Sequence, residues 1–145
     1  MLDVILLLAL MLVVSGVGFA VRARFVEQSR VANAFEYLED IQVSQQLHYV
    51  QTGKYATHLD DLDLSIPSPA YFAVGEIRVS SADQAAPGWE LQLQRAGAAP
   101  LFGAYAITFN GLGFDARHSS VETSIVPHEG QRSRFHQVLA LAVLR

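Results

Sequence analysis

A single acidic residue, Asp3, lies near the start of a long apolar run. From Met1 to Val21 that run is otherwise interrupted only by one serine and two glycines, Gly16 and Gly18. A carboxylate in the hydrocarbon of a membrane costs roughly 2.5 kcal/mol or more, so it is retained where a partner or a function compensates for it. Two interpretations stay open: Asp3 makes an assembly contact, or it lies at the level of the lipid head groups, where the cost is small.

The other residue types that carry chemistry do not form a recognised site. Asp60, Asp61 and Asp63 place three carboxylates in one loop, but they lack the oxygen spacing and glycine of a calcium loop, so a solvated turn is the stronger interpretation. The five histidines have no metal-ligand spacing with a second His or Cys, and Ser119 and Ser120 lack the glycine frame of a nucleophile elbow. The sequence therefore predicts a protein that is not an enzyme and has neither a metal site nor a cofactor.

The composition narrows the class of protein further. The 145 residues carry a net charge of -4 and contain no cysteine, so neither disulfides nor thiol chemistry is available. Because no basic face can neutralise phosphates, no nucleic-acid partner is expected. If about fifty residues are committed to one helix, the remainder can bury only a small core, and the helix must help to cover it.

These residues are positioned by a long N-terminal helix, predicted over 1–52. A bilayer core about 30 Å thick requires about twenty apolar residues at 1.5 Å each, and Val4 to Val21 comes close to that length. Since the chain opens without a basic segment and the helical pattern continues after Ala20, a cleaved secretory signal is the weaker interpretation. We therefore expect a membrane segment at 1–21 and an amphipathic segment at 22–52 of the same helix.

The amphipathic segment has a clear apolar pattern. Its apolar residues recur at three- and four-residue steps and then continue on a shifted stripe: Val31, Phe35, Leu38 and Ile41, then Val43, Leu47 and Val50. This spacing is typical of a helix that lays one face on a packed layer. The helix is predicted to end at Gly53, because glycine readily takes the left-handed conformation of a C-terminal cap.

Charged residues are sorted along the same segment. The basic residues are Arg22, Arg24 and Arg30, and the acidic ones further on are Glu36, Glu39 and Asp40. Arg24 and Glu36 are separated by roughly 18 Å along the axis, so the two groups cannot pair within one helix. Either they pair between staggered neighbouring chains, which would fix the register of an assembly, or they form a solvated face.

The residues after the helix predict a small antiparallel sheet. Alternating apolar residues indicate strands at 75–80, 89–95 and 105–109, with a turn at 110–113 and a fourth strand possible at 119–126. The segment 55–72 is predicted to be an irregular connecting loop with one helical turn. Because the alternation buries one face of the sheet, we expect the stripe on the helix to cover it.

The overall expectation is an α+β fold, with a long N-terminal helix packed on a small antiparallel sheet. The predicted parts are the helix at 1–52, a globular head at 53–129 and a C-terminal tail at 130–145. Leucines and other apolar residues from Gln131 to Arg145 indicate that the tail is a short helix.

Several short segments resemble a known protein family in their residues and in the order in which they occur. They are Ser29, Arg30, Val31 and Ala34; His48, Tyr49, Gln51, Thr52, Gly53 and Tyr55; Leu59, Asp61, Leu62 and Leu64; Pro67, Ser68, Pro69, Tyr71 and Phe72; and Tyr105, Ala106, Ile107 and Thr108 with Asn110 and Gly113. Following an apolar helix with one early acid, they resemble the type IV pilins and the related pseudopilins of type II secretion. The resemblance covers the chain up to about His128, and the order of the parts is its most specific element.

The resemblance implies a structural subunit of an extracellular filament at the cell surface, a homo-oligomer held together by bundled N-terminal helices. It also implies storage as a single-pass inner-membrane protein, surrounded by membrane lipid, on which a prepilin peptidase and an inner-membrane assembly machinery act. In the family the early acid pairs with the positive N-terminal amine of a neighbouring subunit. This pairing assigns assembly roles to Met1 and Asp3.

The chain departs from the family pattern at its start. Family members carry a basic leader that is cut before an N-methylated residue, and their fifth mature residue is Glu. If Ser29 to Ala34 is matched to the family, Asp3 falls on the Glu position and the mature chain begins about two residues before Met1. If Met1 is the mature first residue, the acid is displaced by two positions.

The membrane helix departs from the family as well, since it lacks the proline that usually breaks it near its end. Gly16 and Gly18 supply a weak point of another kind, because glycine inside a helix costs up to about 1 kcal/mol relative to alanine. Both are therefore included among the candidate assembly residues.

Two alternatives to a pilus subunit stay open. A pseudopilin of a type II secretion system would share the fold and the assembly and differ in filament length. A single-pass membrane-anchored binding domain that does not polymerise belongs to another class. Arg22 and Arg24 favour this domain, because positive residues beside a membrane draw the head toward the cytoplasm unless a basic leader precedes them.

Overall fold

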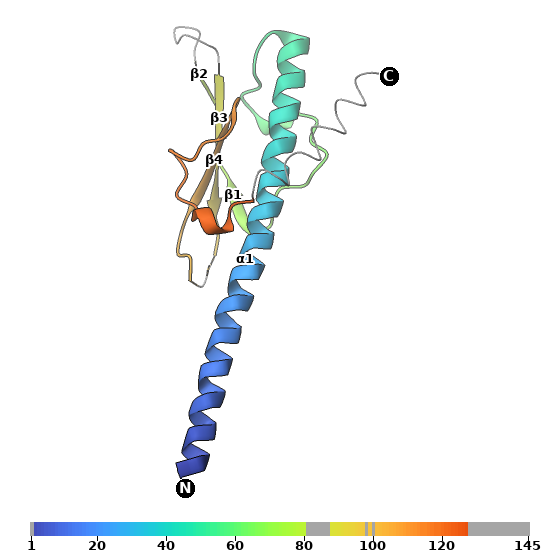
Figure 1. The fold of residues 1–145 in the computed structure, drawn as a ribbon. Helices are drawn as coiled ribbons and strands as arrows, with labels where there is room; N and C mark the ends of the chain where they lie inside the picture. Colours follow the sequence, from blue (N-terminus) through green and yellow to red (C-terminus); the bar gives the residue numbers. More distant parts are fainter. Residues whose placement is uncertain (1, 81–87, 98, 100, 128–145) are drawn as a thin grey trace.

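The computed structural model describes residues 2–80, 88–97, 99 and 101–127, apart from the side chains of residues 2, 4–10 and 12–17. One long helix, α1 (Leu2–Thr52), packs against a small five-stranded sheet (Figure 1). The strands are β1 (Phe72–Val74), β2 (Arg78–Ser80), β3 (Gly88–Arg95), β4 (Ala106–Asn110) and β5 (Gly113–Phe114), and short 3-10 helices lie at Leu59–Asp61 and Thr123–Ile125. The predicted α+β class, a long helix on a small antiparallel sheet, is confirmed.

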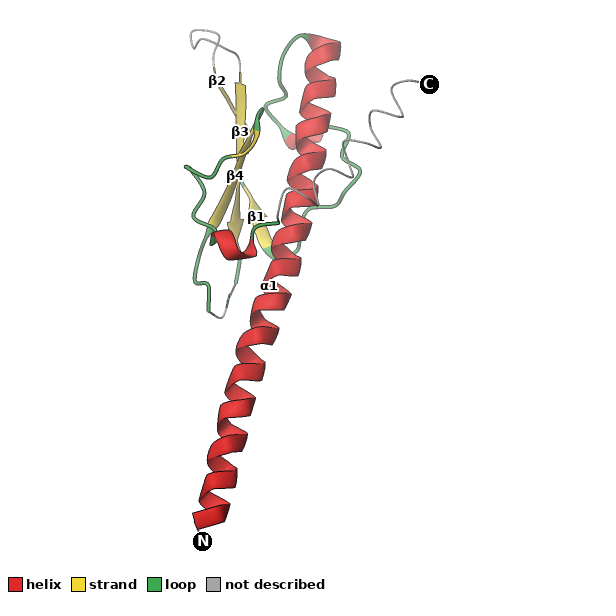
Figure 2. Cartoon of the chain, viewed as in Figure 1, coloured by secondary structure: helices red, strands yellow, loops and turns green. Residues whose placement is uncertain are grey.

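The sheet lies along one side of the C-terminal half of α1, and the N-terminal part of the helix extends beyond it (Figure 2). At 1.5 Å per residue α1 is about 76 Å long. The predicted membrane segment, Val4 to Val21, falls mostly on residues whose side chains are outside the description. Within the described part of the chain, no helix has both the length and the hydropathy required to cross a membrane.

Helix α1 ends where the sequence predicts. Gly53 has a φ of 74°, in the left-handed region, and its N–H donates a 2.8 Å hydrogen bond to the carbonyl of Tyr49. The Thr52 hydroxyl donates to the carbonyl of His48 at 2.8 Å, which satisfies a second carbonyl in the last turn. A residue other than glycine would be strained in this backbone conformation at position 53.

The core lies between α1 and one face of the sheet. On β3 the buried residues alternate as predicted, and Leu91 pairs directly with Phe109 of β4. The helix covers them with its predicted apolar face, the buried residues Val31, Phe35, Leu38 and Ile41. Phe35 meets Phe109 edge to face, with ring centroids 5.4 Å apart, so the expected helix-on-sheet contact is confirmed.

The first predicted strand, 75–80, is wrong in its extent. The chain pairs with β3 twice, through β1 opposite Leu93 to Arg95 and through β2 opposite Gly88 to Glu90. Between the two strands the N–H of Gly75 donates to the Gln92 carbonyl at 2.9 Å, and an added Cβ at Gly75 would lie only 2.8 Å from that oxygen. Residues 75–77 oppose only two residues of β3, 91 and 92, so an extra residue separates β1 from β2. Of β1, only Phe72 lies in the predicted loop at 55–72, and its other two residues fall between that loop and the predicted strand.

A fourth strand at 119–126 is not formed, and β5 is the strand that follows β4. The segment does run beside β4, but serine hydroxyls take part in its contacts: the N–H of Thr108 donates to Ser119 Oγ at 2.8 Å, and the N–H of Ala106 donates to Ser120 Oγ at 2.9 Å. Because side chains replace part of the backbone ladder, the segment leaves the sheet and ends in the 3-10 helix at Thr123–Ile125.

The shifted apolar stripe at the end of α1 does not face the core, which corrects a second expectation. Val43, Leu47 and Val50 are all exposed, whereas Ser44 and Gln45 are buried. Along this part of α1 a loop covers the helix in place of the sheet, and the backbone groups of the loop require hydrogen-bond partners. Polar side chains therefore occupy the buried positions, and the apolar ones face away.

The predicted head, 53–129, is described up to Pro127, and the predicted tail at 130–145 lies outside the described residues.

Candidate functional site

A buried polar cluster joins α1 to the head at the point where the helix leaves the sheet. The Glu27 carboxylate accepts hydrogen bonds of 2.6 Å from both Arg95 Nε and the Tyr105 hydroxyl. Its second oxygen accepts from Arg30 Nη1 at 3.1 Å and from Arg95 Nη2 at 3.3 Å. The side chains of Glu27 and Arg95 are only 2% and 1% exposed. The charges are therefore buried but compensated.

The environment keeps this ion pair charged. Burial raises the pKa of Glu27, but the hydrogen bonds from Arg95, Tyr105 and Arg30 outweigh it, so the pKa lies below its ordinary value. The hydrogen bond to Glu27 raises the pKa of Arg95 despite desolvation. Burial, followed by the contact with the carboxylate, strongly raises the pKa of Tyr105, which therefore stays a proton donor. The cluster is structural, since each group is held in its ordinary charge state.

This cluster is not among the sites predicted from the sequence, although the sequence carries a signal for it. Arg95 follows Leu91 and Leu93 at two-residue steps, so it lies on the buried face of β3. Glu27 precedes Val31 by four residues and shares its helix face. Glu27 therefore lies on the buried face of the helix and Arg95 on the buried face of the strand. Because these two faces pack together, the sequence predicts that the two charges meet.

Arg30, Glu39 and Asp40, among the sorted charges on α1, have interactions within the chain. Arg30 bonds to Glu27, and its guanidinium lies 4.1 Å from the centroid of the Tyr71 ring. Asp40 Oδ2 accepts hydrogen bonds from the backbone N–H groups of Ser65, at 2.7 Å, and Ile66, at 2.9 Å. These contacts give Arg30 and Asp40 roles within the chain that the sequence did not predict.

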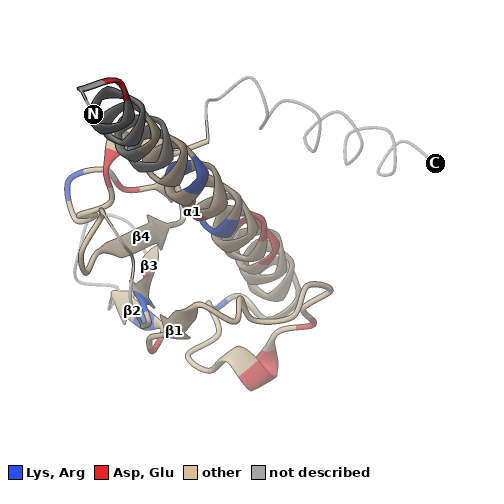
Figure 3. Cartoon of the chain, turned by 90° about the horizontal axis from the view of Figure 1, so that it is seen from below, with Lys and Arg blue, Asp and Glu red and all other residues tan. Residues whose placement is uncertain are grey.

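The remaining sorted charges lie toward the surface. Arg22, Arg24 and Glu36 are exposed and Glu39 is half-buried. Seen from below, basic and acidic positions follow one another along α1 (Figure 3). Pairing between staggered chains stays a prediction for these four residues.

The candidate assembly residues near the start of α1 are not brought together with the head. Asp3 is exposed, Gly16 lies within α1, and Met1 is outside the described residues. A Cβ added at Gly18 would meet nothing within 4 Å. Packing within the described chain therefore does not require glycine at position 18.

The face of α1 opposite the sheet carries exposed apolar side chains. Phe25 is 73% exposed and lies on the same face as Val43, because eighteen residues make about five turns of helix. Leu47 and Val50 continue this face, and Met11 is exposed closer to the N-terminus. Glu36 is exposed on the same face, about three turns after Phe25, so the face is apolar with one charge in it. Exposed apolar side chains on the side of a helix away from its core are typical of a helix that packs against a further layer.

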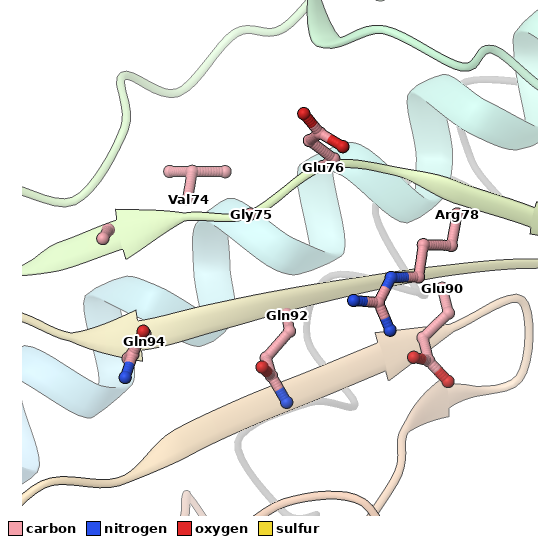
Figure 4. A pocket seen from close by; sticks show the side chains of 8 residues that line it. Val74, Gly75, Glu76, Arg78, Glu90, Gln92 and Gln94 are labelled. Atoms are coloured by element: carbon pink, nitrogen blue, oxygen red, sulfur yellow. The ribbon is translucent and has the colours of Figure 1, made fainter.

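A shallow hollow of about 280 Å³ lies on the outer face of the sheet, where β1 gives way to β2. Figure 4 shows Gln94, Gln92 and Glu90 in a row along β3, with Arg78 beside Glu90. These groups can donate and accept hydrogen bonds, but they include no nucleophile with an adjacent base. Among the described residues, no group of three or more His, Cys, Asp or Glu side chains could hold a metal ion.

Comparison with family models, with curated proteins and with solved structures gives no match to this chain.

Proposed function

We propose that this chain is the structural subunit of a type IV pilus-like extracellular filament, which assembles by bundling of its apolar N-terminal helices. The observation that carries the proposal is the shape of α1. About 27 Å of helix, from Leu2 to Phe19, projects beyond the head, and its sequence is almost entirely apolar. A projection of this kind requires either lipid or other helices around it.

The exposed apolar face of α1 supports bundling. Phe25, Val43, Leu47 and Val50 lie opposite the sheet, so neighbouring stems can pack there without disturbing the core. Lipid and neighbouring helices both shield apolar side chains from water, so the stem is stable in either environment. An assembly machinery of the inner membrane would then supply the work of extraction, after a prepilin peptidase has cut a leader.

The buried cluster at Glu27 supports the same function. It fixes the head to α1 immediately above the projecting stem, through contacts with both Arg95 and Tyr105. A subunit that is pulled from a membrane and packed under lateral load requires such a rigid junction. The filament is then a homo-oligomer with stems at its axis and heads outside.

The proposal is tested with Asp3→Asn, which removes one charge with little change of volume. We expect the wild-type chain to appear in filaments sheared from the cell surface, and the variant to remain in the membrane fraction. Asp60→Asn, which removes an exposed carboxylate from a loop of the head, is the matched control and should assemble normally. If the wild-type chain occurs only as membrane-embedded monomers, it is an anchored domain and the proposal is wrong.

A further inference from the structure

We propose that the base of the head is a membrane-docking surface, which binds the phospholipid head groups around the stem. The proposal rests on the proposed function, because it requires α1 to be anchored in a bilayer. A hollow at this base is lined by Ala20, Val21 and Arg24 of α1 and by Leu101, Phe102 and Glu122 of the head. The described part of the β3–β4 connection lies at the end of the head nearer to the N-terminus of α1 (Figure 1).

The depth of the hollow follows from the sequence of the stem. Val21 is the last residue of the predicted membrane segment and also lines the hollow, so the hollow lies at the boundary between hydrocarbon and water. Phe19 and Phe25, on either side of Val21, are 62% and 73% exposed. Aromatic side chains are enriched at this boundary because their rings fit the head-group region.

The head presents an apolar side chain at the same level. Leu101 is 64% exposed and has a φ of 76°, a left-handed conformation that is rare for leucine. The turn is held by hydrogen bonds from the N–H groups of Phe102, at 3.1 Å, and Gly103, at 3.2 Å, to the carbonyl of Ala99. Backbone strain of this kind clusters at ligand contacts, and here it holds a leucine outward beside the stem.

The charges around the hollow suit a phosphate-bearing surface. Arg22 and Arg24 are exposed at the end of the predicted membrane segment, where a long basic side chain can reach lipid phosphates. Glu122 is the opposing acid, and its Oε1 accepts a 2.5 Å hydrogen bond from the Ser124 hydroxyl. Leu101 would enter the upper acyl region while the arginines bind head groups, which fixes the tilt of the head on the membrane.

The absence of cysteine makes a site-specific test possible. A polarity-sensitive fluorophore is attached to Leu101→Cys in the full chain, reconstituted into vesicles of phosphatidylcholine with phosphatidylglycerol. The matched control is Leu112→Cys, which lies in the β4–β5 turn and is 98% exposed. Gln42 donates to the neighbouring Gly111 carbonyl, which places this turn about 31 Å beyond Val21 along α1.

We expect emission from position 101 to shift to the blue and to be quenched severalfold by lipids brominated near the head group, while position 112 behaves as in water. Arg24→Gln should reduce the quenching difference between vesicles with and without the anionic lipid, and Arg117→Gln, an exposed arginine of the head, should not.

Carbonate extraction separates the two proposals. If the chain resists extraction but position 101 remains as water-exposed as position 112, the docking surface is wrong and the anchored stem stands. If the label responds only in assembled filaments, the surface is a contact between subunits, which also overturns the inference. If carbonate releases the chain, both proposals fall.

Discussion

Glu27 connects the helix to the sheet through two partners that lie 68 and 78 residues away in the chain, Arg95 and Tyr105. A buried ion pair contributes little net stability compared with apolar residues, since desolvation offsets the attraction. Its removal is nevertheless costly, because the remaining charge is left buried without a partner. We therefore expect the Glu27 ion pair to fix the position of the head on α1 and to add little to the stability of the chain beyond what apolar residues at the same positions would give.

Glu27→Gln should destabilise the chain by about 3–5 kcal/mol, because Arg95 would keep its charge in a buried site. Unfolding by urea in detergent micelles can be followed with the fluorescence of Trp89, the single tryptophan, which is buried on β3. Glu36→Gln removes an exposed carboxylate from the same helix and should change stability by no more than about 0.5 kcal/mol. Equal effects of the two substitutions would contradict a structural role for Glu27.

The same pair predicts a dependence of stability on pH. The pKa of Glu27 is lowered in the folded chain from the ordinary value of 4.5, so the unfolded chain binds the proton more readily. The contribution of Glu27 is therefore complete above pH 4.5 and is lost as the pH falls through the lower folded pKa. Glu27→Gln should lose less stability over this acidic range than the wild-type chain does, and an equal loss would count against the pair.

At the scale of elements, long periodic segments were predictable and short ones were not. Apolar residues alternate in the sequence of β3 and β4, and α1 is continuous up to Gly53, so their positions follow from local pattern, although Thr108 of β4 is buried as well. The β1 and β2 strands have three residues each and are defined by pairing with β3, a long-range contact that no local pattern records. The stripe that begins at Val43 was expected to face the core, but it is exposed. Periodicity shows which residues share a face of the helix, but it does not show what covers that face.

The loop after α1 is held by side chains of the helix. Asp40 Oδ2 accepts the backbone N–H groups of Ser65 and Ile66, and the Gln45 amide both donates to and accepts from the backbone of Ala56. Ser44 donates to the Asp63 carbonyl at 3.0 Å. Polar residues of α1 therefore determine the path of this loop.

Asp40→Ala should release the loop locally, by about 1–3 kcal/mol, because two backbone donors lose their shared acceptor. Amide hydrogen exchange at Ser65 and Ile66 should accelerate, while exchange at Ala56, which is held by Gln45, should not change. Filament formation should persist in this variant. Loss of filaments with unchanged exchange at Ser65 and Ile66 would mean that Asp40 pairs with a neighbouring chain, which was one of the two interpretations of the sorted charges.

A glycine lies at the break between β1 and β2, where the backbone passes close to β3. Gly75→Ala would place a methyl group 2.8 Å from the Gln92 carbonyl oxygen, so we expect a loss of about 1–3 kcal/mol in urea unfolding. Gly18→Ala, where the added methyl meets nothing within 4 Å, is the control and should not destabilise the chain, since alanine in a helix is favoured over glycine by up to about 1 kcal/mol. If Gly75→Ala leaves the stability unchanged, the backbone of β3 can move to accommodate the added methyl group.

At the scale of the whole molecule, α1 has two faces with different roles. One face builds the core with the sheet through residues such as Phe35 and Leu38, and the opposite face carries Phe25, Val43 and Leu47 toward the outside. The head needs only the first face. The second face and the projecting stem are what the proposed filament uses.

Electron cryomicroscopy of filaments sheared from cells tests the bundling of stems most directly. We expect rods of helical density packed about 8–10 Å apart around the filament axis, with the sheets outside and the Phe25 face of each helix turned inward. Filaments with sheets at the axis, or sheared fractions that lack the chain while it is abundant in the membrane as monomers, would contradict assembly through the stem.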